Sequence, residues 1–373
     1  MQNFDIFIFA AEKSADIHGA NLIKEILKIN PNLKIAAVAG PKMRELKIYP
    51  IMRMEDFLTM GFIDILFALI KLIKNFFYLR KTLLKINPKA CIFIDYPDFN
   101  LRLEKSLRRK GYQNKLIHYI SPSVWAWRHK RSNFMAKYLD LLITIFPFEK
   151  PFFSHTTLDV RYIGHPLAYE IQNFKNQDLK KELIGIFPGS RKTEIERNFP
   201  LQLKAAKKLL KNNRNLKFAI SISDKSLIDK IFKLENLDPS KFIFFSPDQN
   251  YLFMQKLKGA MATSGTINLE LALNKVPTVV NFAIKALDLF IARKILKINL
   301  RFYCIVNIIL QEETFSELYG PNLNVDSLFE SCQKLFFDEK NQIKCKKNCS
   351  KLKDILVSKN ANKNAAKIIL SFI

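Results

Sequence analysis

The feature that most constrains the fold is a regular alternation of short apolar runs with longer helical patterns. Strand-like runs occur at Phe4–Ala10, Leu33–Val38, Ala90–Ile94, Lys115–Ile120 and Leu141–Phe146. Helical spacing of apolar residues lies between them, at Ile17–Ile29, Phe57–Ile86 and Phe99–Lys110. Strands that alternate with helices predict an α/β fold, with a parallel sheet covered by helices on both faces.

The alternation stops in a polar stretch and then restarts. Residues Ile171–Lys181 carry no strand-like periodicity, which predicts a linker. Further strands are expected at Leu183–Phe187, Leu216–Ile220, Ile243–Phe245, Ala260–Ala262 and Thr278–Val280, with a helix at Pro200–Leu210. A chain of 373 residues is also too long for one ordinary core. We therefore predict two Rossmann-like, doubly wound domains, 1–170 and 171–350, and a final helical segment, 351–373, that packs back on the first domain.

Basic residues outnumber acidic ones by 60 to 34, which makes the formal net charge +26. Such a charge attracts polyanions such as nucleic acid, anionic lipid or phosphorylated substrates. A general compositional bias toward Lys, Ile, Asn and Phe explains it equally well, and the sequence leaves both explanations open. Because the basic residues are spread along the chain without a nucleic-acid-binding motif, we expect no nucleic-acid partner.

The strongest phosphate-binding candidate follows the strand that begins the second series. Gly189, Ser190 and Arg191 lie between that strand and the next helix, so backbone amides and a guanidinium are available to an anion. A plain turn with an exposed arginine fits the same residues, and the sequence does not decide between these interpretations. Ligands of doubly wound sheets bind at such strand ends, and in two tandem domains the strand ends would face a central cleft.

A second candidate of the same kind follows a later strand. Ser264, Gly265 and Thr266 open a helix, and Glu270 lies one turn further on the same helix face. Hydroxyls beside a carboxylate can hold a diphosphate and a ribose diol together. A capped core helix whose glutamate contacts a lysine explains the spacing equally well.

In the first domain, Asp98 ends a strand and enters a helix. A carboxylate at this position can act as a general base toward an attacking hydroxyl. Asp98 could instead cap the helix, but Leu101 stands where a capping box would carry Glu or Gln. We interpret the neighbouring Asp95 as structural.

Two more loops of the first domain carry polar or aromatic side chains at strand ends. The opening loop contains Glu12, Ser14, Asp16 and His18 but lacks the G-x-G-x-x-G pattern, which disfavours a dinucleotide cofactor. Its side chains can contact an acceptor, or Ser14 and Asp16 can simply cap the helix. A later loop, at 119–128, contains both tryptophans of the chain. Those rings can pack against a sugar or an acyl chain, and they can equally be part of the hydrophobic core or of a contact between domains.

The most apolar part of the chain, Phe57–Leu79, alternates large apolar residues with Lys71, Lys74 and, just beyond it, Arg80. Apolar residues recur at helical spacing at Phe62, Leu66, Leu69, Ile70, Ile73, Phe76 and Phe77. An interfacial helix with cations at the lipid headgroups has this composition. A buried helix face has it as well. Asp64 and the lysines interrupt the run, so we expect no membrane crossing.

Taken together, these segments resemble the lipid A disaccharide synthase family along the whole chain. The resemblance rests on AEKSADIHGA (11–20), DYPDFN (95–100), HYISPSVWAWR (118–128), FPGSR (187–191) and ATSGTINLELAL (262–273). It implies a GT-B fold and an inverting glycosyltransferase of lipid A, and hence lipopolysaccharide, biosynthesis. The implied reaction joins UDP-2,3-diacylglucosamine to 2,3-diacylglucosamine 1-phosphate (lipid X), giving a β(1→6) disaccharide 1-phosphate and UDP.

The resemblance also assigns roles to residues. Asp98 matches the general base, with Glu12 as a second catalytic candidate. Residues expected to bind UDP and phosphate are Gly189, Ser190, Arg191, Ser264, Gly265, Thr266, Glu270 and Asn307. Residues expected to bind the acceptor are Ser14, Asp16, His18, Ser121, Trp125 and Arg128. The family usually has glycines where Ala11 and Ala15 stand here, and a proline before the position of Asn307.

Partners and place follow from the same resemblance. No metal and no cofactor are expected, since the UDP-linked sugar is a substrate. Expected partners are the glycolipid substrates, an anionic membrane surface and a second copy in a homodimer. The expected place is the cytoplasmic face of the inner membrane of a Gram-negative bacterium. Alternatives are another UDP-sugar enzyme of the GT-B fold, such as a murein-type transferase or a 2-epimerase, and a basic anion-binding protein without turnover.

Overall fold

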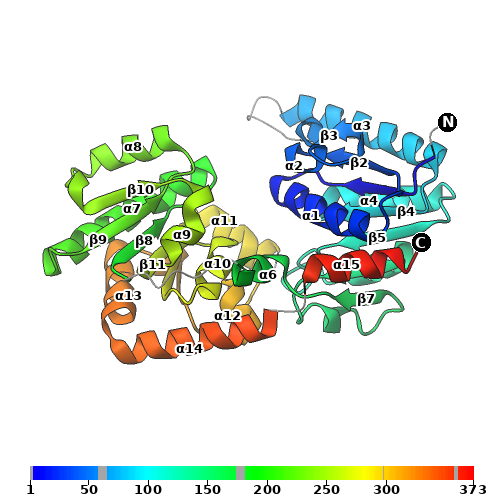
Figure 1. Ribbon diagram of the computed structural model, residues 1–373. Helices are drawn as coiled ribbons and strands as arrows, with labels where there is room; N and C mark the ends of the chain where they lie inside the picture. The colour runs from blue at the N-terminus through cyan, green and yellow to red at the C-terminus, as the bar shows by residue number, and fades with distance from the viewer. Residues whose placement is uncertain (1–2, 58–64, 174–180, 297, 357–359) are drawn as a thin grey trace. The chain divides into compact units, whose positions relative to one another are not determined.

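The computed structural model describes the chain except residues 1–2, 58–64, 174–180, 297 and 357–359 (Figure 1). The described chain forms two compact units. Unit 1 contains Met1–Pro166 and Ser358–Ile373, and unit 2 contains Leu167–Val357. The chain therefore leaves unit 1 once and returns to it at its carboxyl end.

Unit 1 is built on a seven-stranded sheet in the order β3-β2-β1-β4-β5-β6-β7, and its described pairings are all parallel. The strands are β1 (Ile6–Phe9), β2 (Ile35–Ala39), β3 (Tyr49–Arg53), β4 (Ala90–Ile94), β5 (Lys115–Tyr119), β6 (Leu141–Thr144) and β7 (Asp159–Tyr162). The helices are α1 (Lys13–Ile29), α2 (Pro41–Arg44), α3 (Ile65–Ile86), α4 (Pro97–Arg109), α5 (Arg131–Tyr138) and α15 (Ala361–Leu370), with short helices η1 (Met54–Phe57) and η2 (Lys150–Phe153).

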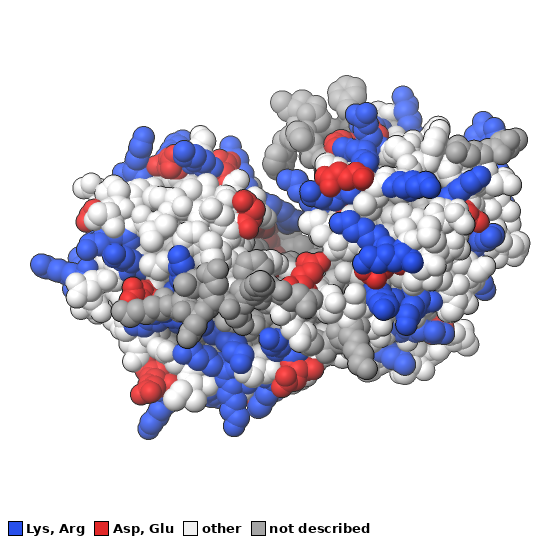
Figure 2. All heavy atoms as spheres, viewed as in Figure 1, with Lys and Arg blue, Asp and Glu red and all other residues white. Residues whose placement is uncertain are grey.

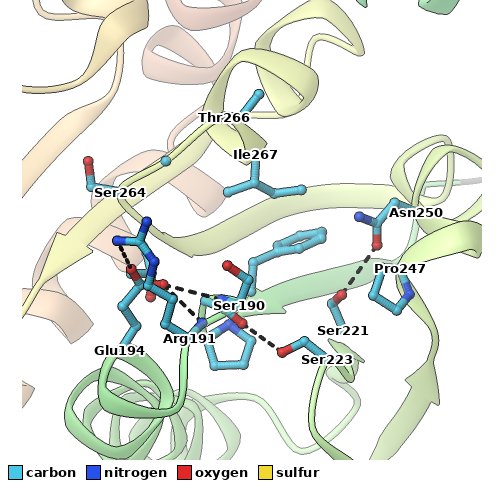
Figure 3. Close-up of a pocket in the computed structure, with 15 residues that line it drawn as sticks. Ser190, Arg191, Glu194, Ser221, Ser223, Pro247, Asn250, Ser264, Thr266 and Ile267 are labelled. Atoms are coloured by element: carbon cyan, nitrogen blue, oxygen red, sulfur yellow. Dashed lines mark hydrogen bonds and ion pairs between the residues drawn. The ribbon is translucent and has the colours of Figure 1, made fainter. Parts of the chain in front are cut away.

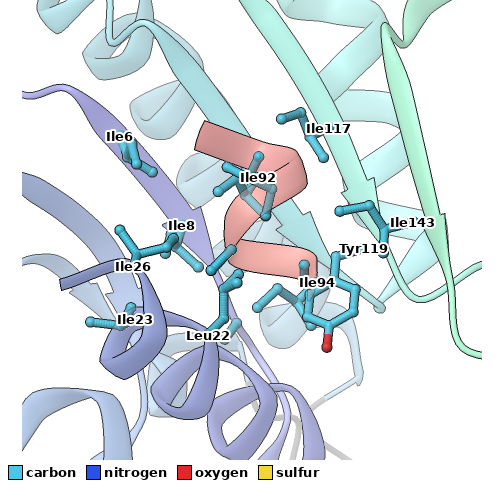
Figure 4. Close-up of a cluster of buried hydrophobic side chains, with 14 of the residues drawn as sticks. Ile6, Ile8, Leu22, Ile23, Ile26, Ile92, Ile94, Ile117, Tyr119 and Ile143 are labelled. Atoms are coloured by element: carbon cyan, nitrogen blue, oxygen red, sulfur yellow. The ribbon is translucent and has the colours of Figure 1, made fainter. Parts of the chain in front are cut away.

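Alternation along the strands gives this sheet a core on each face. Ile6 and Ile8 pack with α1 and α15, as Figure 4 shows, whereas Phe7 and Phe9 pack with α3, α4 and α5. Helix α1 faces the sheet because its buried residues recur at helical spacing, for example at Leu22 and Ile26. Helix α15, red in Figure 1, lies against α1.

Unit 2 repeats the plan with six parallel strands in the order β10-β9-β8-β11-β12-β13. The strands are β8 (Leu183–Phe187), β9 (Lys217–Ser221), β10 (Phe242–Phe245), β11 (Leu257–Thr263), β12 (Thr278–Phe282) and β13 (Ser316–Tyr319). The longer helices are α6 (Pro166–Asn173), α7 (Lys192–Asn212), α8 (Lys225–Leu234), α13 (Val325–Phe337) and α14 (Glu339–Leu356). The shorter ones are α9 (Asn250–Met254), α10 (Ile267–Leu273), α11 (Ala286–Phe290), α12 (Ile305–Leu310), the π-helix η5 (Ile291–Ile295), and η3 (Pro239–Lys241), η4 (Pro247–Gln249) and η6 (Gly320–Asn322).

In both sheets the first strand lies between the second and the fourth, which is the strand order of the dinucleotide-binding fold. The order in which strands are added to the sheet reverses between β1 and β4 in unit 1, and between β8 and β11 in unit 2. Loops that follow these four strands therefore diverge and leave room for a ligand. The candidate motifs at Glu12, Asp98, Gly189 and Ser264 follow these four strands.

The structure differs from the sequence predictions at several elements. Strands β3, β7 and β13 were not predicted, because these edge strands are short and mostly half-buried and lack an apolar run. The segment predicted for 351–373 is divided between two helices: α14 ends at Leu356 in unit 2, whereas α15 packs on α1 of unit 1, as predicted for the end of the chain. Helix α7 begins at Lys192 and contains Pro200 instead of starting there. Most of the predicted linker, and Phe62 of the apolar region, lie outside the described residues.

No helix in the described ranges is long and apolar enough to cross a membrane. All five cysteines are free and buried. Lys and Arg are distributed over the visible faces of both units instead of forming one stripe, as Figure 2 shows. The distribution agrees with the even spread of basic residues along the sequence.

Candidate functional site

Unit 2 has a cavity of about 440 Å³ between the loops that follow β8 and β11 (Figure 3). Its lining includes Gly189, Ser190 and Arg191 from the first loop and Ser264, Gly265 and Thr266 from the second. The remaining lining residues are Phe187, Pro188, Glu194, Ser221, Ser223, Pro247, Asn250, Thr263 and Ile267. The structure thus brings together six of the eight residues predicted to bind UDP and phosphate.

The loop after β8 has the conformation of an anion-binding turn. Gly189 has a φ of +111°, and a Cβ there would lie 2.9 Å from both Cβ and Oε2 of Glu194. Oε2 of Glu194 accepts hydrogen bonds of 3.3 Å from the backbone amides of Ser190 and Arg191. The amides at this start of α7 therefore already hold a carboxylate, while the Arg191 side chain is 83% exposed and faces the cavity rim (Figure 3). A phosphate can use the same donors.

Buried amide side chains hold this loop in place from below. Asn281 on β12 accepts a 2.9 Å hydrogen bond from Gln202 and donates one of 3.0 Å to Asn198, both on α7. Asn198 donates to the carbonyl of Glu194, and Gln202 donates to the carbonyl of Phe187. The loop geometry therefore depends on long-range contacts that no local sequence pattern reveals.

Glu270 and Asn307, the other two predicted UDP ligands, do not line this cavity. Burial, with a smaller contribution from the charge of Glu170, raises the pKa of Glu270 to about 7. Near pH 7 Glu270 is therefore a partly neutral carboxyl, one turn beyond Thr266 on α10.

The structure places Asn307, a predicted UDP ligand, away from this cavity, in a hydrogen-bond network of its own. Asn307 is fully buried, and its carbonyl oxygen accepts from the backbone amides of Thr314 and Phe315. Its amide nitrogen donates to the carbonyl of Phe315 and to Oε1 of Glu317, each at 2.7 Å. These bonds join α12 to β13 and to the segment before it, and they use both acceptor sites and both donor hydrogens of the side-chain amide.

In unit 1, Asp98 lies in the first turn of α4 and is 68% exposed. Its Oδ1 accepts a 2.8 Å hydrogen bond from Arg128 and a second one from Arg131. Both guanidiniums also lie over the ring of Trp127, at 4.0 and 5.5 Å. The structure therefore places the predicted base in a cluster of two arginines and a tryptophan, of which Arg131 was not found from the sequence.

The backbone before Asp98 is strained. Asp95 and Tyr96 both have a φ of +50°, a left-handed conformation that non-glycine residues rarely adopt. Asn100 stabilises it by donating a 2.6 Å hydrogen bond to the carbonyl of Asp95. Burial raises the pKa of Asp95, and the nearby His118 partly offsets that rise.

A buried polar pair lies close to this loop. Nδ1 of His118 on β5 is 2.7 Å from Oε1 of Glu104 on α4, and both side chains are inaccessible to solvent. Sequence reasoning missed both residues, although a glutamate among the apolar positions of α4 was a usable signal. The pair ties α4, which carries Asp98, to the central sheet.

The predicted acceptor residues of the opening loop differ in their surroundings. Asp16 is buried, and its two carboxylate oxygens accept hydrogen bonds from the backbone amides of Lys42 and Met43 at the start of α2. Burial lowers the pKa of His18 to about 4, so this imidazole is neutral near pH 7. Glu12 and Ser14 remain exposed, and burial together with the charge of Glu12 raises the pKa of Tyr96.

Neither alanine of the opening loop has a positive φ, and Ala15 is part of α1. The glycines usual at these positions are therefore not required by this backbone. Among the other acceptor candidates, Ser121 is buried and donates to the carbonyl of Pro122, whereas Trp125 packs edge-on against Phe148. Arg128 alone among these candidates contacts Asp98.

Helix α3 has a buried apolar face and an exposed one. Leu79 and Leu83 are buried in the core of unit 1, and Phe76 packs on Phe99. The opposite face remains exposed at Leu69, Ile70, Ile73, Phe77 and Tyr78. The Arg80 guanidinium lies 4.9 Å from the centre of the Phe77 ring. The side chain of Leu66 lies outside the described residues.

Comparison with known proteins shows which family the chain is similar to. A model described as lipid-A-disaccharide synthetase matches residues 6–371. The lipid-A-disaccharide synthase of Chlamydia pneumoniae is 39% identical over 84% of this chain and 53% of that protein. The corresponding protein of Geobacter sulfurreducens is 29% identical over 99% of this chain and 97% of its own. The chain therefore spans about half the length of the chlamydial relative but nearly all of the Geobacter one.

Solved structures agree on the fold. The UDP-GlcNAc 2-epimerase from Neisseria meningitidis bound to UDP-GlcNAc has a TM-score of 0.63 at 13% identity, covering 98% of each chain. MurG of Acinetobacter baumannii has a TM-score of 0.60 at 11% identity, covering 98% of this chain and 99% of its own. At these identities the likeness shows the fold, which is GT-B with two Rossmann-like domains.

Proposed function

The chain belongs to the lipid-A-disaccharide synthetase family, and from that premise we propose that it is an inverting glycosyltransferase acting on acylated glucosamines. The donor is UDP-2,3-diacylglucosamine and the acceptor is 2,3-diacylglucosamine 1-phosphate. The products are the β(1→6)-linked lipid A disaccharide 1-phosphate and UDP. The observation that carries the proposal is the cavity at the β8–β11 reversal, where two predicted phosphate-binding loops line one space.

The donor half of the reaction uses unit 2. The diphosphate of the donor contacts Arg191 and the amides of Ser190 and Arg191, and it displaces the carboxylate of Glu194 from those amides. The hydroxyls of Ser264 and Thr266 complete the phosphate site, and Glu270 accepts hydrogen bonds from the ribose. Donors fixed in advance around the departing diphosphate stabilise the negative charge that develops on it.

The acceptor half uses unit 1. The 6-hydroxyl of the acceptor attacks the anomeric carbon of the donor, the bond from that carbon to the diphosphate breaks, and UDP leaves. Asp98 takes the proton of the hydroxyl, and Glu12, in the exposed opening loop, is a second carboxylate that can assist it. The acceptor 1-phosphate binds Arg128 and Arg131, and this exchange releases Oδ1 of Asp98 from its two ion pairs. Atoms and charge balance without a cofactor or metal.

The lipid substrates place the protein at a membrane. We propose a peripheral position on the inner face of the inner membrane of a Gram-negative bacterium. The exposed face of α3 supports this proposal, because Phe77 and Ile73 stand among Lys71, Lys74 and Arg80. A second copy of the chain in a homodimer remains part of the proposal.

The deciding experiment is incubation with both acylated substrates in detergent, followed by mass analysis of the lipid product. Arg191→Gln is the inactive comparison, and Lys192→Gln removes a neighbouring exposed cation outside the cavity lining. Formation of the disaccharide 1-phosphate by the wild type supports the proposal. Turnover of unacylated UDP-N-acetylglucosamine alone would instead identify another UDP-sugar enzyme of this fold. UDP binding without turnover of any substrate would identify an anion-binding protein.

A further inference from the structure

A second surface with exposed apolar side chains lies on unit 2, at α11 and the π-helix η5. Leu287 is 67% exposed, Phe290 56%, Ile295 64% and Leu296 43%. Contiguous exposed apolar patches often mark an interaction site. We refer to these four residues, with Lys285, Arg293 and Lys294, as the 285–296 surface.

The charges of this surface are predominantly positive. Lys285, Arg293 and Lys294 are all exposed. From Lys285 to Arg301 the sequence contains five basic residues and a single acidic one, Asp288. Asp288 is itself ion-paired, 3.9 Å from a guanidinium nitrogen of Arg197. An anionic partner is therefore attracted to this surface, and a second copy presenting the same surface is repelled.

A cavity of about 450 Å³ opens beside the surface. Its apolar walls include Ile284, Leu289, Phe290 and Pro321, and Arg293 and Lys294 also line it. The turn at Gly320 closes one side, because its φ of +56° brings the backbone against Leu289, whose Cδ2 would lie 3.1 Å from an added Cβ. This cavity is distinct from the one that contains Arg191, since the two share no lining residue.

We propose that the 285–296 surface docks unit 2 on an anionic lipid bilayer. Leu287, Phe290, Ile295 and Leu296 enter the acyl region, Arg293 and Lys294 remain with the lipid phosphates, and the adjoining cavity accepts part of one acyl chain. Apolar side chains interleaved with cations fit a bilayer interface, because hydrocarbon and anionic headgroups are the two chemistries that it offers side by side. The inference rests on the proposed function, in which the enzyme takes both of its lipid substrates from a membrane. It adds a lipid contact on unit 2 to the one proposed for α3 of unit 1.

The test is sedimentation of the full chain with vesicles of phosphatidylglycerol and phosphatidylethanolamine, compared with phosphatidylcholine vesicles. One variant is Leu287→Ser/Phe290→Ser, and the matched control is Leu234→Ser, which changes a leucine on α8 that is 77% exposed. A second variant is Arg293→Gln/Lys294→Gln. We expect the apolar variant to bind anionic vesicles at least about tenfold more weakly, since each buried CH₂ contributes to partitioning. The charge variant should lose on the order of fivefold for each cation removed, and only on anionic vesicles.

Wild-type binding by either variant, a wild type that does not bind anionic vesicles, or an equal loss for Leu234→Ser would overturn the inference. A change of oligomeric state in the apolar variant, with vesicle binding retained, would identify a protein interface instead. Turnover with detergent-dispersed substrates separates this inference from the proposed function. Variants that lose vesicle binding but keep turnover with detergent-dispersed substrates support both the docking inference and the proposed function. Loss of vesicle binding in variants of a chain that never turns over supports docking and removes the proposed reaction.

Discussion

A guanidinium nitrogen of Arg128 lies 2.8 Å from Oδ1 of Asp98, which makes the candidate base part of an ion pair before any substrate binds. The same oxygen also accepts from Arg131. Oδ1 is therefore occupied by two guanidinium groups, and another anion has to take over these arginines before an acceptor hydroxyl can contact that oxygen. The acceptor phosphate supplies that anion in the proposed reaction.

Replacing Asp98 with Asn should lower kcat by about 100-fold or more, because a positioned general base contributes about that much. Calorimetric binding of UDP should remain at the wild-type affinity, since the UDP cavity is made of unit 2 residues. Asp159→Asn is the matched control, because Asp159 is an exposed unit 1 carboxylate with a 2.8 Å ion pair to Arg161. Near-wild-type turnover by Asp98→Asn would show that another group is the base.

Two glycines of the cavity should respond differently to alanine. Gly189→Ala should destabilise the protein by about 1–3 kcal/mol, because its φ is positive and the new methyl group meets Glu194. Gly265→Ala should leave the thermal midpoint unchanged, since an added Cβ there has no heavy atom within 4 Å. If the diphosphate approaches Gly265, the second variant should nevertheless bind UDP more weakly. Unchanged UDP affinity for Gly265→Ala would place the phosphates elsewhere.

Asn307→Ala should lower the free energy of unfolding by on the order of 3 kcal/mol, because it leaves several buried backbone groups without partners. UDP affinity of the folded fraction should stay within twofold of wild type, roughly the scatter of a neutral substitution. Thermal denaturation followed by circular dichroism, and calorimetry below the midpoint, measure the two quantities. Lost UDP binding with an unchanged midpoint would restore the ligand role of Asn307.

Acid should weaken unit 1 through two buried histidines. Burial lowers the pKa of His18 to about 4; burial and the neighbouring His18 lower that of His165 to about 3. Between these values and 6.5 the unfolded chain binds more protons than the folded one, so stability rises with pH in that window and is lost as pH falls through it. From pH 7 to 5 the loss should be on the order of 2 kcal/mol for each histidine, at about 1.4 kcal/mol per pKa unit.

Urea unfolding followed by tryptophan fluorescence measures this loss selectively, because Trp125 and Trp127 are the only tryptophans and both lie in unit 1. His165→Gln should remove about half of the acid sensitivity, whereas the exposed His129→Gln should leave it unchanged. Equal acid sensitivity in all three proteins would exclude the buried histidines as its cause.

Binding of a UDP-linked sugar should tighten as pH rises through 7. Burial, with a contribution from Glu170, raises the pKa of Glu270 to about 7, and only the charged form accepts hydrogen bonds from both ribose hydroxyls. Glu270→Gln should bind more weakly at pH 8 and lose the pH dependence. A wild-type affinity that is constant from pH 6 to 8 would show that Glu270 does not contact the ligand.

Much of the architecture was predictable because it depends on local patterns. Apolar runs alternating with helical periodicity predicted two parallel α/β units, and polar motifs at strand ends predicted the loops that line the unit 2 cavity. Edge strands such as β7 escaped prediction, because pairing on one side and partial burial leave no continuous apolar run. The split between α14 and α15 escaped as well, since both helices are amphipathic and only their packing partners differ.

By itself, the sequence determined which residues stand after the strands at the two reversal points, and therefore where anions can bind. Only the tertiary structure decided which of those residues are available. Asp16 and Asn307 have ligand-like chemistry, but their hydrogen bonds go to backbone groups 26 and seven residues away, respectively. Asp98 is bound by arginines 30 and 33 residues further along. A polar side chain is a ligand or a clamp according to which distant groups the fold brings within hydrogen-bond distance, and local spacing does not contain that information.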